Sequence, residues 1–355
     1  MDVSFYGVIE GVFGRPWSWE VRRGYADFLK ENGYTFYIYA PKEDSILREN
    51  WEDDWAADFG QELHRLGAHY RSRGLEWGIG LSPYEAYLNF DEEKRGALKN
   101  KIASINRYDP DILCVLFDDM KGDVPKLAEI QVRIFRAIMD LSNARRFILC
   151  PTYYSFDPIL EKEYGNMPDH YLEDLAGRLD PGAHIFWTGP KVLSKEYSPS
   201  HLRKVTDLLG RKPFIWDNYP VNDGTRMSRY LHLRAFENRT QEMKRLTAGH
   251  AVNPMNQAWL SRIPLKTLEI SVREGTAYDP RAAFQEAVEA LCGPQLATAL
   301  CEDLSAFQDE GLDGLDEKQK EALVQKYQGF DSPYAEEVVS WLKGEYAFDP
   351  DCLTN

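Results

Sequence analysis

The sequence predicts an α/β fold, a (β/α)8 barrel of the TIM type with a small C-terminal all-helical appendage. Eight short runs rich in β-branched and aromatic residues alternate with amphipathic stretches of helical period. Several of these runs are almost continuously apolar, which is typical of parallel strands buried on both faces. Residues 276–355 contain helical patterns and no strand pattern.

The expected strands and helices alternate along roughly the first 260 residues, as a (β/α)8 barrel requires. The strands are Ser4–Glu10, Thr35–Ala40, Glu76–Leu81, Ile112–Phe117, Arg146–Cys150, His184–Trp187, Pro213–Trp216 and His250–Val252. The helices between them include Trp17–Asn32, Trp55–Arg73, Asp91–Arg107, Val124–Leu141 and Ser200–Leu209. A doubly wound open sheet is the structural alternative. The count of eight strands favours the barrel, and neither a GxGxxG motif after the first strand nor a GxxxxGK[ST] motif is present.

Three further helices are expected after the barrel, at Pro280–Ala297, Lys318–Tyr327 and Pro333–Tyr346. Gly293 and Pro294 should break the first of them, because glycine and proline both disfavour a helix interior. We therefore predict a catalytic barrel over residues 1–275 and a helical region over residues 276–355.

The composition is that of an ordinary globular protein that does not bind nucleic acid. The chain has 355 residues, 43% of them hydrophobic and 28% charged, and a formal net charge of −15. Nucleic-acid binders usually present a basic surface, so this charge argues against such a partner. We expect the five cysteines to be reduced thiols; they are Cys114, Cys150, Cys292, Cys301 and Cys352. No signal peptide or membrane span is visible, so a cytoplasmic location is expected.

Polar side chains and glycines follow almost every expected strand. Because the active site of a (β/α)8 barrel is built at the carboxyl ends of its strands, these segments should share one site. They are Glu10–Trp17, Pro41-Lys42, Asp118-Asp119, Thr152–Tyr154, Thr188–Lys191, Asp217-Asn218 with Asn222-Asp223, and Asn253-Pro254.

The pair Asp118-Asp119 is the most informative of these segments. Two adjacent carboxylates after a buried strand lose hydration and disfavour each other's ionisation, so such a pair can divide into a neutral acid and a charged stabiliser. Aspartates that merely cap a helix or lie in a solvated turn are the alternative, but the polar residues at the other strand ends favour a site. Neighbouring strand residues point to opposite faces, so the chain must bend here, with one aspartate on the strand and one on the turn.

Aromatic rings near the strand ends suggest a sugar as the ligand. The chain has 9 Trp, 20 Tyr and 17 Phe, most of which we expect in the core. Trp216 is the best candidate for a wall of the site, because Asn218–Asp223 beside it offers partners for hydroxyl groups. Metal ions are not expected, since the histidines are scattered and His64 and His69 are spaced five apart rather than four. The absence of a GxSxG motif also argues against acyl transfer.

Seven of these segments together resemble glycoside hydrolase family 84, the O-GlcNAcase and bacterial hyaluronidase-like β-N-acetylglucosaminidases. The matching blocks are GVIEGVFGRPW (Gly7–Trp17), YIYAPKED (Tyr37–Asp44), LFDDM (Leu116–Met120), CPTYY (Cys150–Tyr154), FWTGPKVLSKE (Phe186–Glu196), FIWDNYPVND (Phe214–Asp223) and AVNP (Ala251–Pro254). The resemblance implies retaining hydrolysis of terminal β-linked N-acetylglucosamine, with the substrate's acetamido group as nucleophile and an oxazoline intermediate. Substrate assistance of this kind departs from the usual two-carboxylate scheme of glycosidases.

The resemblance also assigns roles residue by residue. Asp118 would orient the acetamido N–H, Asp119 would act as general acid and then base, and Tyr154 would hydrogen-bond the acetamido carbonyl. The implied substrate-binding residues are Gly11, Lys42, Trp216, Asn218, Asp223 and Asn253, of which Asn218 would contact the acetamido group and Asp223 the 4- and 6-hydroxyls. No cofactor is implied, and the partner would be a glycoprotein or oligosaccharide that carries N-acetylglucosamine.

Three departures from the family pattern leave the natural aglycone open: protein, oligosaccharide or glycosaminoglycan. The sequence does not give the oligomeric state. Tyr153 stands where many relatives have Glu, Gly224 where relatives can have Tyr, and Val12-Phe13 where they have Phe-Tyr. We place these residues at the rim of the site. An endo-acting hyaluronidase-type hexosaminidase is the alternative enzyme, and a non-catalytic sugar-binding barrel is the alternative from another class.

Overall fold

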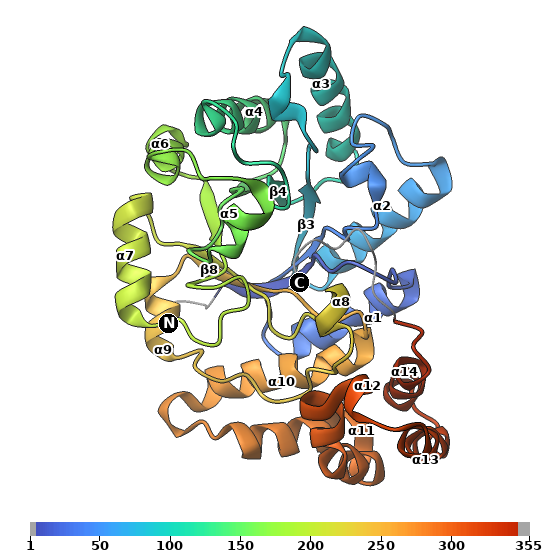
Figure 1. Ribbon diagram of the computed structural model, residues 1–355. Coiled ribbons are helices and arrows are strands. Elements are labelled where there is room, and N and C mark those ends of the chain that lie inside the picture. The colour runs from blue at the N-terminus through green and yellow to red at the C-terminus, as the bar shows by residue number, and fades with distance from the viewer. Residues whose placement is uncertain (1–4, 347–355) are drawn as a thin grey trace. The chain divides into compact units, whose positions relative to one another are not determined.

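The computed structural model describes residues 5–346 and contains the expected closed barrel (Figure 1). Eight parallel strands pair in sequence order, and β1 closes the barrel against β8. The strands are β1 (Tyr6–Glu10), β2 (Phe36–Tyr39), β3 (Glu76–Leu81), β4 (Ile112–Leu116), β5 (Arg146–Cys150), β6 (His184–Trp187), β7 (Phe214–Asp217) and β8 (Gly249–Val252). The predicted (β/α)8 fold is confirmed. Ser4, where the first strand was expected to begin, lies outside the described residues.

Helices connect the strands and lie outside the barrel, as Figure 1 shows for α2, α3, α4, α6 and α7. They are α1 (Trp19–Glu31), α2 (Ala57–Ser72), α3 (Glu92–Asn106), α4 (Leu127–Leu141), α5 (Ile159–Tyr164), α6 (Tyr171–Arg178), α7 (Pro199–Leu209) and α9 (Gln241–Leu246). Short 3-10 turns occupy Ser45–Leu47 and Ala86–Leu88. Ser18, Asp91 and Ser198 cap α1, α3 and α7 by accepting a first-turn backbone N–H, the usual reason for such residues at helix starts.

Aromatic side chains fill the interior of the barrel. Phe36 on β2 and Phe214 on β7 meet edge to face at 5.9 Å, although their strands are not neighbours. Phe214 contacts Phe186 on β6 at 5.3 Å, and Phe186 contacts Trp216 at 5.2 Å, again edge to face. This series of rings packs against Trp216 and fixes its position, because aromatic pairs prefer edge-to-face geometry.

A buried ion pair fastens α1 to the barrel. The Arg22 guanidinium donates to both carboxylate oxygens of Glu10, with Nη2 2.6 Å from Oε1 and Nε 2.9 Å from Oε2. The Tyr37 hydroxyl also donates to Glu10, and Arg22 lies 5.0 Å from the ring centres of Trp19 and Tyr39. Burial alone lowers the pKa of Arg22, but the attraction of Glu10 outweighs it and raises the pKa above its ordinary value. The Arg22 guanidinium therefore stays charged.

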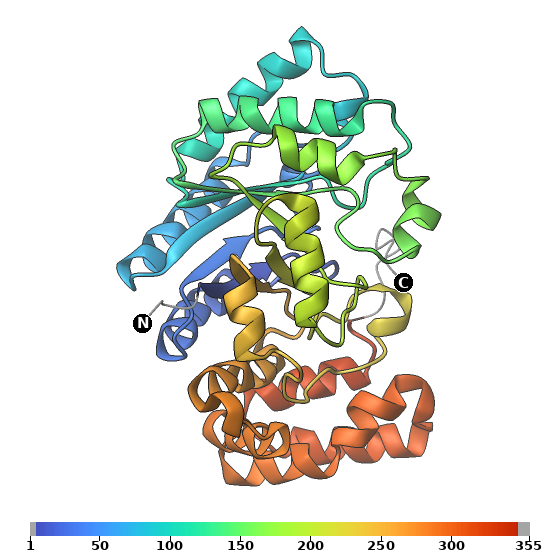
Figure 2. The same ribbon diagram turned by 90° about the vertical axis from the view of Figure 1, so that its left-hand side faces the viewer.

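The remaining residues form a second compact unit that contains Val12–Trp17, Asn218–Gln241 and the chain from Asn253 onward. Its helices are α8 (Gly224–Met227), α10 (Ala258–Glu274), α11 (Pro280–Glu302), α12 (Gly311–Gly314), α13 (Glu317–Gln328) and α14 (Pro333–Leu342), with a 3-10 turn at Gly275–Ala277 and a π-helical turn at Ala306–Glu310. Figure 2 shows the orange and red helices α10–α14 packed on one another, around a core that includes Phe307, Tyr327 and Trp341.

The helical C-terminal region is confirmed, and Gly293 interrupts α11 with non-helical φ of 72° and ψ of 165°. The division after residue 275 stays a prediction, since this unit also takes in segments that follow β1, β7 and β8. Cys352 and the rest of the predicted region beyond residue 346 lie outside the described residues. No helix in residues 5–346 combines the length and apolar character needed to cross a bilayer.

We expect Arg22→Met to lower the free energy of unfolding by about 3–5 kcal/mol, because it leaves the Glu10 carboxylate buried without its counterion. Arg203→Met is the matched control, since Arg203 pairs with Glu242 at 2.7 Å but its side chain is 59% exposed; its loss should be below about 1 kcal/mol. Urea unfolding of both variants measures the difference, and equal losses would contradict the structural role of the pair.

We expect stability to fall as the pH drops from about 6.5 to 4, in part through His184. Burial, with the charges of Arg146 and Arg211, lowers its pKa to about 4, so protonation favours the unfolded chain in this window. His184→Gln should recover about 1–3 kcal/mol of the loss at pH 4. Urea unfolding at pH 7 and pH 4 tests this, with exposed His64→Gln as control; parallel pH dependence in all three proteins would refute it.

Candidate active site

The chain bends at Asp118 and Asp119, so that both carboxylates face one cation. β4 ends at Leu116, and a hydrogen bond of 2.9 Å from Phe117 N to Cys150 O carries the pairing one residue further. Both aspartates therefore lie beyond the strand, which corrects the expectation that one would lie on it. Asp119 has a φ of 56°, a left-handed conformation that is uncommon outside glycine and clusters at functional sites.

The cation is Lys42, which follows β2. Its Nζ lies 2.5 Å from Asp118 Oδ2 and 3.7 Å from Asp119 Oδ2. Burial lowers the pKa of Lys42, but the attraction of Asp118 and then Asp119 outweighs it, so the pKa is raised and the ammonium stays charged. The loop is fixed by Asp44, whose Oδ2 accepts from Tyr39 Oη and Trp55 Nε1, each at 2.9 Å.

Asp118 and Asp119 differ in their remaining partners. Asp118 is 5% exposed, and its Oδ1 has no hydrogen-bond partner among the described residues. Leaving a buried acceptor unpaired costs about 1–3 kcal/mol, so a bound molecule with an N–H or O–H group could be held there. Asp119 Oδ1 instead accepts from two phenols, Tyr154 Oη at 3.2 Å and Tyr164 Oη at 2.8 Å.

Tyr154 lies after β5, and Tyr164 is the last residue of α5. Burial, together with the negative charge of Asp119, raises the pKa of Tyr154 well above its ordinary value, so its hydroxyl remains a donor. Sequence analysis did not predict Tyr164 as a site residue. The only signal was a further tyrosine ten positions after Tyr154, in a segment too short to show a helical period.

A buried polar network holds the ends of β4 and β5 at a fixed spacing. Thr152 donates to Phe117 O at 2.8 Å and accepts from Gln131 Nε2 at 2.9 Å, while Tyr171 Oη donates to Gln131 Oε1 at 2.5 Å. Phe117 directly precedes Asp118, and Thr152 lies two residues before Tyr154. Because every bond of the network is buried, it should restrict how far the two carboxylates and the Tyr154 phenol can separate.

The residues that we placed at the rim as departures from the family are buried instead. Tyr153 is 1% exposed, and its hydroxyl donates to Gly165 O at 2.6 Å. Val12, Phe13 and Gly224 are also buried. These residues are therefore not exposed at a rim, and their effect on the aglycone stays a prediction.

Two other predicted residues lie in the same unit as the carboxylates. Trp216, near the end of β7, is 5% exposed and packs edge to face on Phe186. Gly11 directly follows β1, where its N–H donates to Ile9 O at 2.9 Å in a tight turn.

The second unit holds the other three predicted residues, Asn218, Asp223 and Asn253. Asn253 Nδ2 donates to Asn218 Oδ1 at 3.1 Å. Asp223 Oδ2 accepts from Phe13 N at 2.9 Å. In sequence, Asn218 directly follows β7 and Asn253 directly follows β8.

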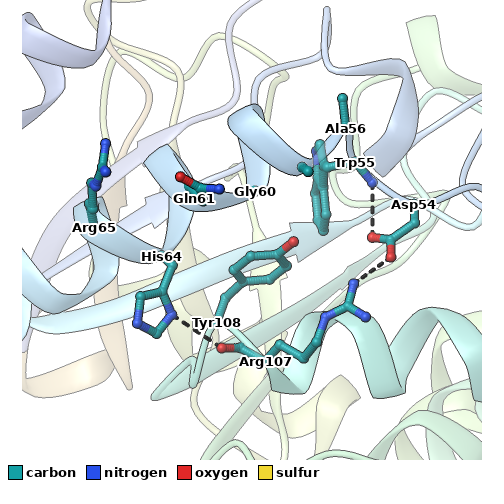
Figure 3. Close-up of a pocket in the computed structure, with 10 residues that line it drawn as sticks. Asp54, Trp55, Ala56, Gly60, Gln61, His64, Arg65, Arg107 and Tyr108 are labelled. Carbon is teal, nitrogen blue, oxygen red and sulfur yellow. Dashed lines mark hydrogen bonds and ion pairs between the residues drawn. The ribbon is translucent and has the colours of Figure 1, made fainter.

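An open cavity of about 480 Å³ lies apart from these residues, on the outer surface beside α2 (Figure 3). Trp55, Tyr108 and His64 contribute to its lining, and Arg107 forms an ion pair with Asp54 at its edge. None of the predicted site residues lines it. Within residues 5–346, no three His, Cys, Asp or Glu side chains are grouped so that they could hold a metal ion.

Known proteins resemble this chain in both sequence and structure. Residues 6–308 match a family model described as β-N-acetylglucosaminidase. The Protein O-GlcNAcase sequences of Rattus norvegicus and Mus musculus are each 28% identical over 271 residues, which is 74% of this chain and 29% of each relative. The chain thus spans less than a third of these curated relatives.

A solved mutant of an O-GlcNAc hydrolase from Thermobaculum terrenum has a TM-score of 0.79 and 28% identity to this chain. The similarity covers 96% of this chain and 81% of that one. Together with the family match over most of the sequence, it confirms the resemblance inferred from the seven strand-end blocks. The chain belongs to the β-N-acetylglucosaminidase family, glycoside hydrolase family 84.

Proposed function

We propose that this chain is an O-GlcNAcase-like hydrolase that removes terminal β-linked N-acetylglucosamine with retention, through an oxazoline intermediate. The observation that carries the proposal is the unequal environment of two adjacent buried carboxylates. Asp118 pairs with Lys42 through Oδ2, and its Oδ1 has no hydrogen-bond partner among the described residues. Asp119 accepts hydrogen bonds from two phenols, Tyr154 and Tyr164. Substrate-assisted hydrolysis requires such a division, because one carboxylate must stay charged while the other transfers a proton.

Asp118 orients the nucleophile. Its Oδ2 pairs with Lys42, and its Oδ1, which has no hydrogen-bond partner among the described residues, is available to accept the acetamido N–H. Once that N–H is held, the acetamido carbonyl oxygen attacks C1 and forms the C1–O bond of the oxazoline. Positive charge that develops on nitrogen is stabilised by the fixed negative charge beside it.

Asp119 supplies and then recovers the proton. It protonates the departing oxygen as the C1–aglycone bond breaks, so the leaving group departs neutral. It next removes a proton from the water that attacks C1 and opens the oxazoline. Both transfers need a carboxyl group in a fixed position, and the hydrogen bonds from Tyr154 and Tyr164 to Oδ1 support that requirement.

Tyr154 and the substrate-binding residues are assigned by the family motifs. Tyr154 would donate to the acetamido carbonyl as it attacks. Trp216 would stack on the sugar, and Asn218 would hold the acetamido group. The remaining contacts are assigned to Gly11, Lys42, Asp223 and Asn253, with Asp223 on the 4- and 6-hydroxyls. The partner is a glycoprotein or oligosaccharide carrying N-acetylglucosamine, and no cofactor takes part in these steps.

Asp119→Ala should reduce turnover of substrates with poor leaving groups, such as a serine-linked N-acetylglucosamine, by about 10²–10⁴-fold. A dinitrophenyl glycoside, whose leaving group needs little protonation, should lose far less. Steady-state kinetics on both substrates measures the difference. Equal losses on both would show that Asp119 is not the general acid, and a wild-type protein inactive on both would favour a sugar-binding barrel.

A thiazoline analogue of the oxazoline should inhibit the protein, and Asp118→Asn should weaken this inhibition by at least about tenfold. The amide keeps the shape of the carboxylate but removes the charge that stabilises the cationic ring nitrogen. Inhibition constants for wild type and variant test this. If the thiazoline fails to inhibit an active wild-type protein, the substrate-assisted mechanism is wrong; cleavage within hyaluronan rather than at chain ends would favour the endo-acting alternative.

A further inference from the structure

We propose that Tyr164 is a positioning residue for the general acid, and that it retains Asp119 Oδ1 when Tyr154 turns its hydroxyl to the substrate. The inference deepens the proposed function and rests on it. It starts from one carboxylate oxygen that accepts from two phenols, at 2.8 Å from Tyr164 and 3.2 Å from Tyr154.

A phenol carries a single donor proton, so Tyr154 cannot donate to Asp119 and to the acetamido carbonyl at the same time. If Tyr154 were the sole partner of Oδ1, its rotation toward the substrate would leave a buried acceptor unpaired at the moment of proton transfer. Leaving a buried acceptor unpaired is unfavourable, because the group has lost its hydration without gaining a hydrogen bond. The shorter bond from Tyr164 removes the conflict, because it persists when the longer bond from Tyr154 is exchanged.

The arrangement also selects which oxygen of Asp119 transfers the proton. With Oδ1 held by phenols, the other oxygen, Oδ2, is the one left for the departing group and later for water. Oδ2 faces the cationic Lys42, whose Nζ is 3.7 Å away. A carboxyl group fixed at one oxygen keeps the other within a narrow range of directions, which proton transfer requires.

Tyr164 is itself fixed by its neighbours. Gly122, three residues after Asp119, donates its N–H to Tyr164 O at 2.7 Å. The next residue, Gly165, has a φ of 90° and accepts from Tyr153 Oη at 2.6 Å. The Tyr153 ring lies so close to Gly122 that a Cβ there would clash with it. The hydrogen bond to Tyr164 O therefore holds the end of α5 against the segment that carries Asp119, and the hydrogen bond to Gly165 O fixes the residue that follows.

The test compares Tyr164→Phe with Tyr6→Phe in an aryl N-acetylglucosaminide series of decreasing leaving-group ability. Tyr6 supplies the control because its buried hydroxyl also donates a hydrogen bond, to Asn32 O at 3.0 Å, and because it lies at the start of β1, whereas the proposed site residues follow the strand ends. We expect Tyr164→Phe to lower kcat about tenfold for the poorest leaving group and less than about twofold for dinitrophenyl, with little change in KM. Tyr6→Phe should show no such slope.

The pH profile is the second readout. Because ionised Asp119 loses a donor in Tyr164→Phe, the basic limb of kcat should move to higher pH, whereas a general loss of stability would not move it. Adding Tyr154→Phe should then lower kcat by more than the product of the single effects, since no donor to Oδ1 remains. Suppose that the wild-type enzyme turns over the series but Tyr164→Phe is slowed equally on every substrate, or is not slowed at all. That result overturns the role of Tyr164 and leaves the proposed function standing. An inactive wild type overturns the proposed function itself.

Discussion

The structure of the site depends on the charge of Lys42. Two adjacent carboxylates that are 5% and 6% exposed would repel each other and lose hydration, and the ammonium 2.5 Å from one and 3.7 Å from the other offsets both effects. The lysine follows β2 and the aspartates follow β4, and the parallel pairing of both strands with β3 brings these ends together. The tight turn at Asp119, with its positive φ, is tolerated because these contacts hold it.

The two aspartates share Lys42 but differ in their other contacts. Within residues 5–346, Oδ1 of Asp118 has no hydrogen-bond partner, while Oδ1 of Asp119 accepts from Tyr154 and Tyr164. Residue identity alone would make the carboxylates equivalent, and their partners make them distinct. The proposed chemistry needs that asymmetry, because one group stays charged beside a developing cation while the other exchanges a proton twice. The network of Gln131, Thr152 and Tyr171 maintains the spacing on which it depends.

Much of the barrel could be predicted because its strands are buried on both faces and read as apolar runs. Three of them, Glu76–Leu81, Arg146–Cys150 and His184–Trp187, begin and end where the pattern predicts. Helix α5 (Ile159–Tyr164) was not predicted from the sequence, because six residues are too few to show a helical period. Missing this helix affected the site prediction, because Tyr164 is its last residue.

The sequence by itself determined the (β/α)8 fold, the family, and the residue types at the strand ends, because local hydrophobic period and short motifs are properties of neighbouring residues. Tertiary structure decided which groups meet: Lys42 with Asp118 across 76 positions, and Tyr164 with Asp119 across 45. It also decided that Tyr153 is buried and that one oxygen of Asp118 has no hydrogen-bond partner in the part of the chain that the structure describes. Such pairings depend on which strands are neighbours in the sheet and on the paths of loops, which no local pattern encodes.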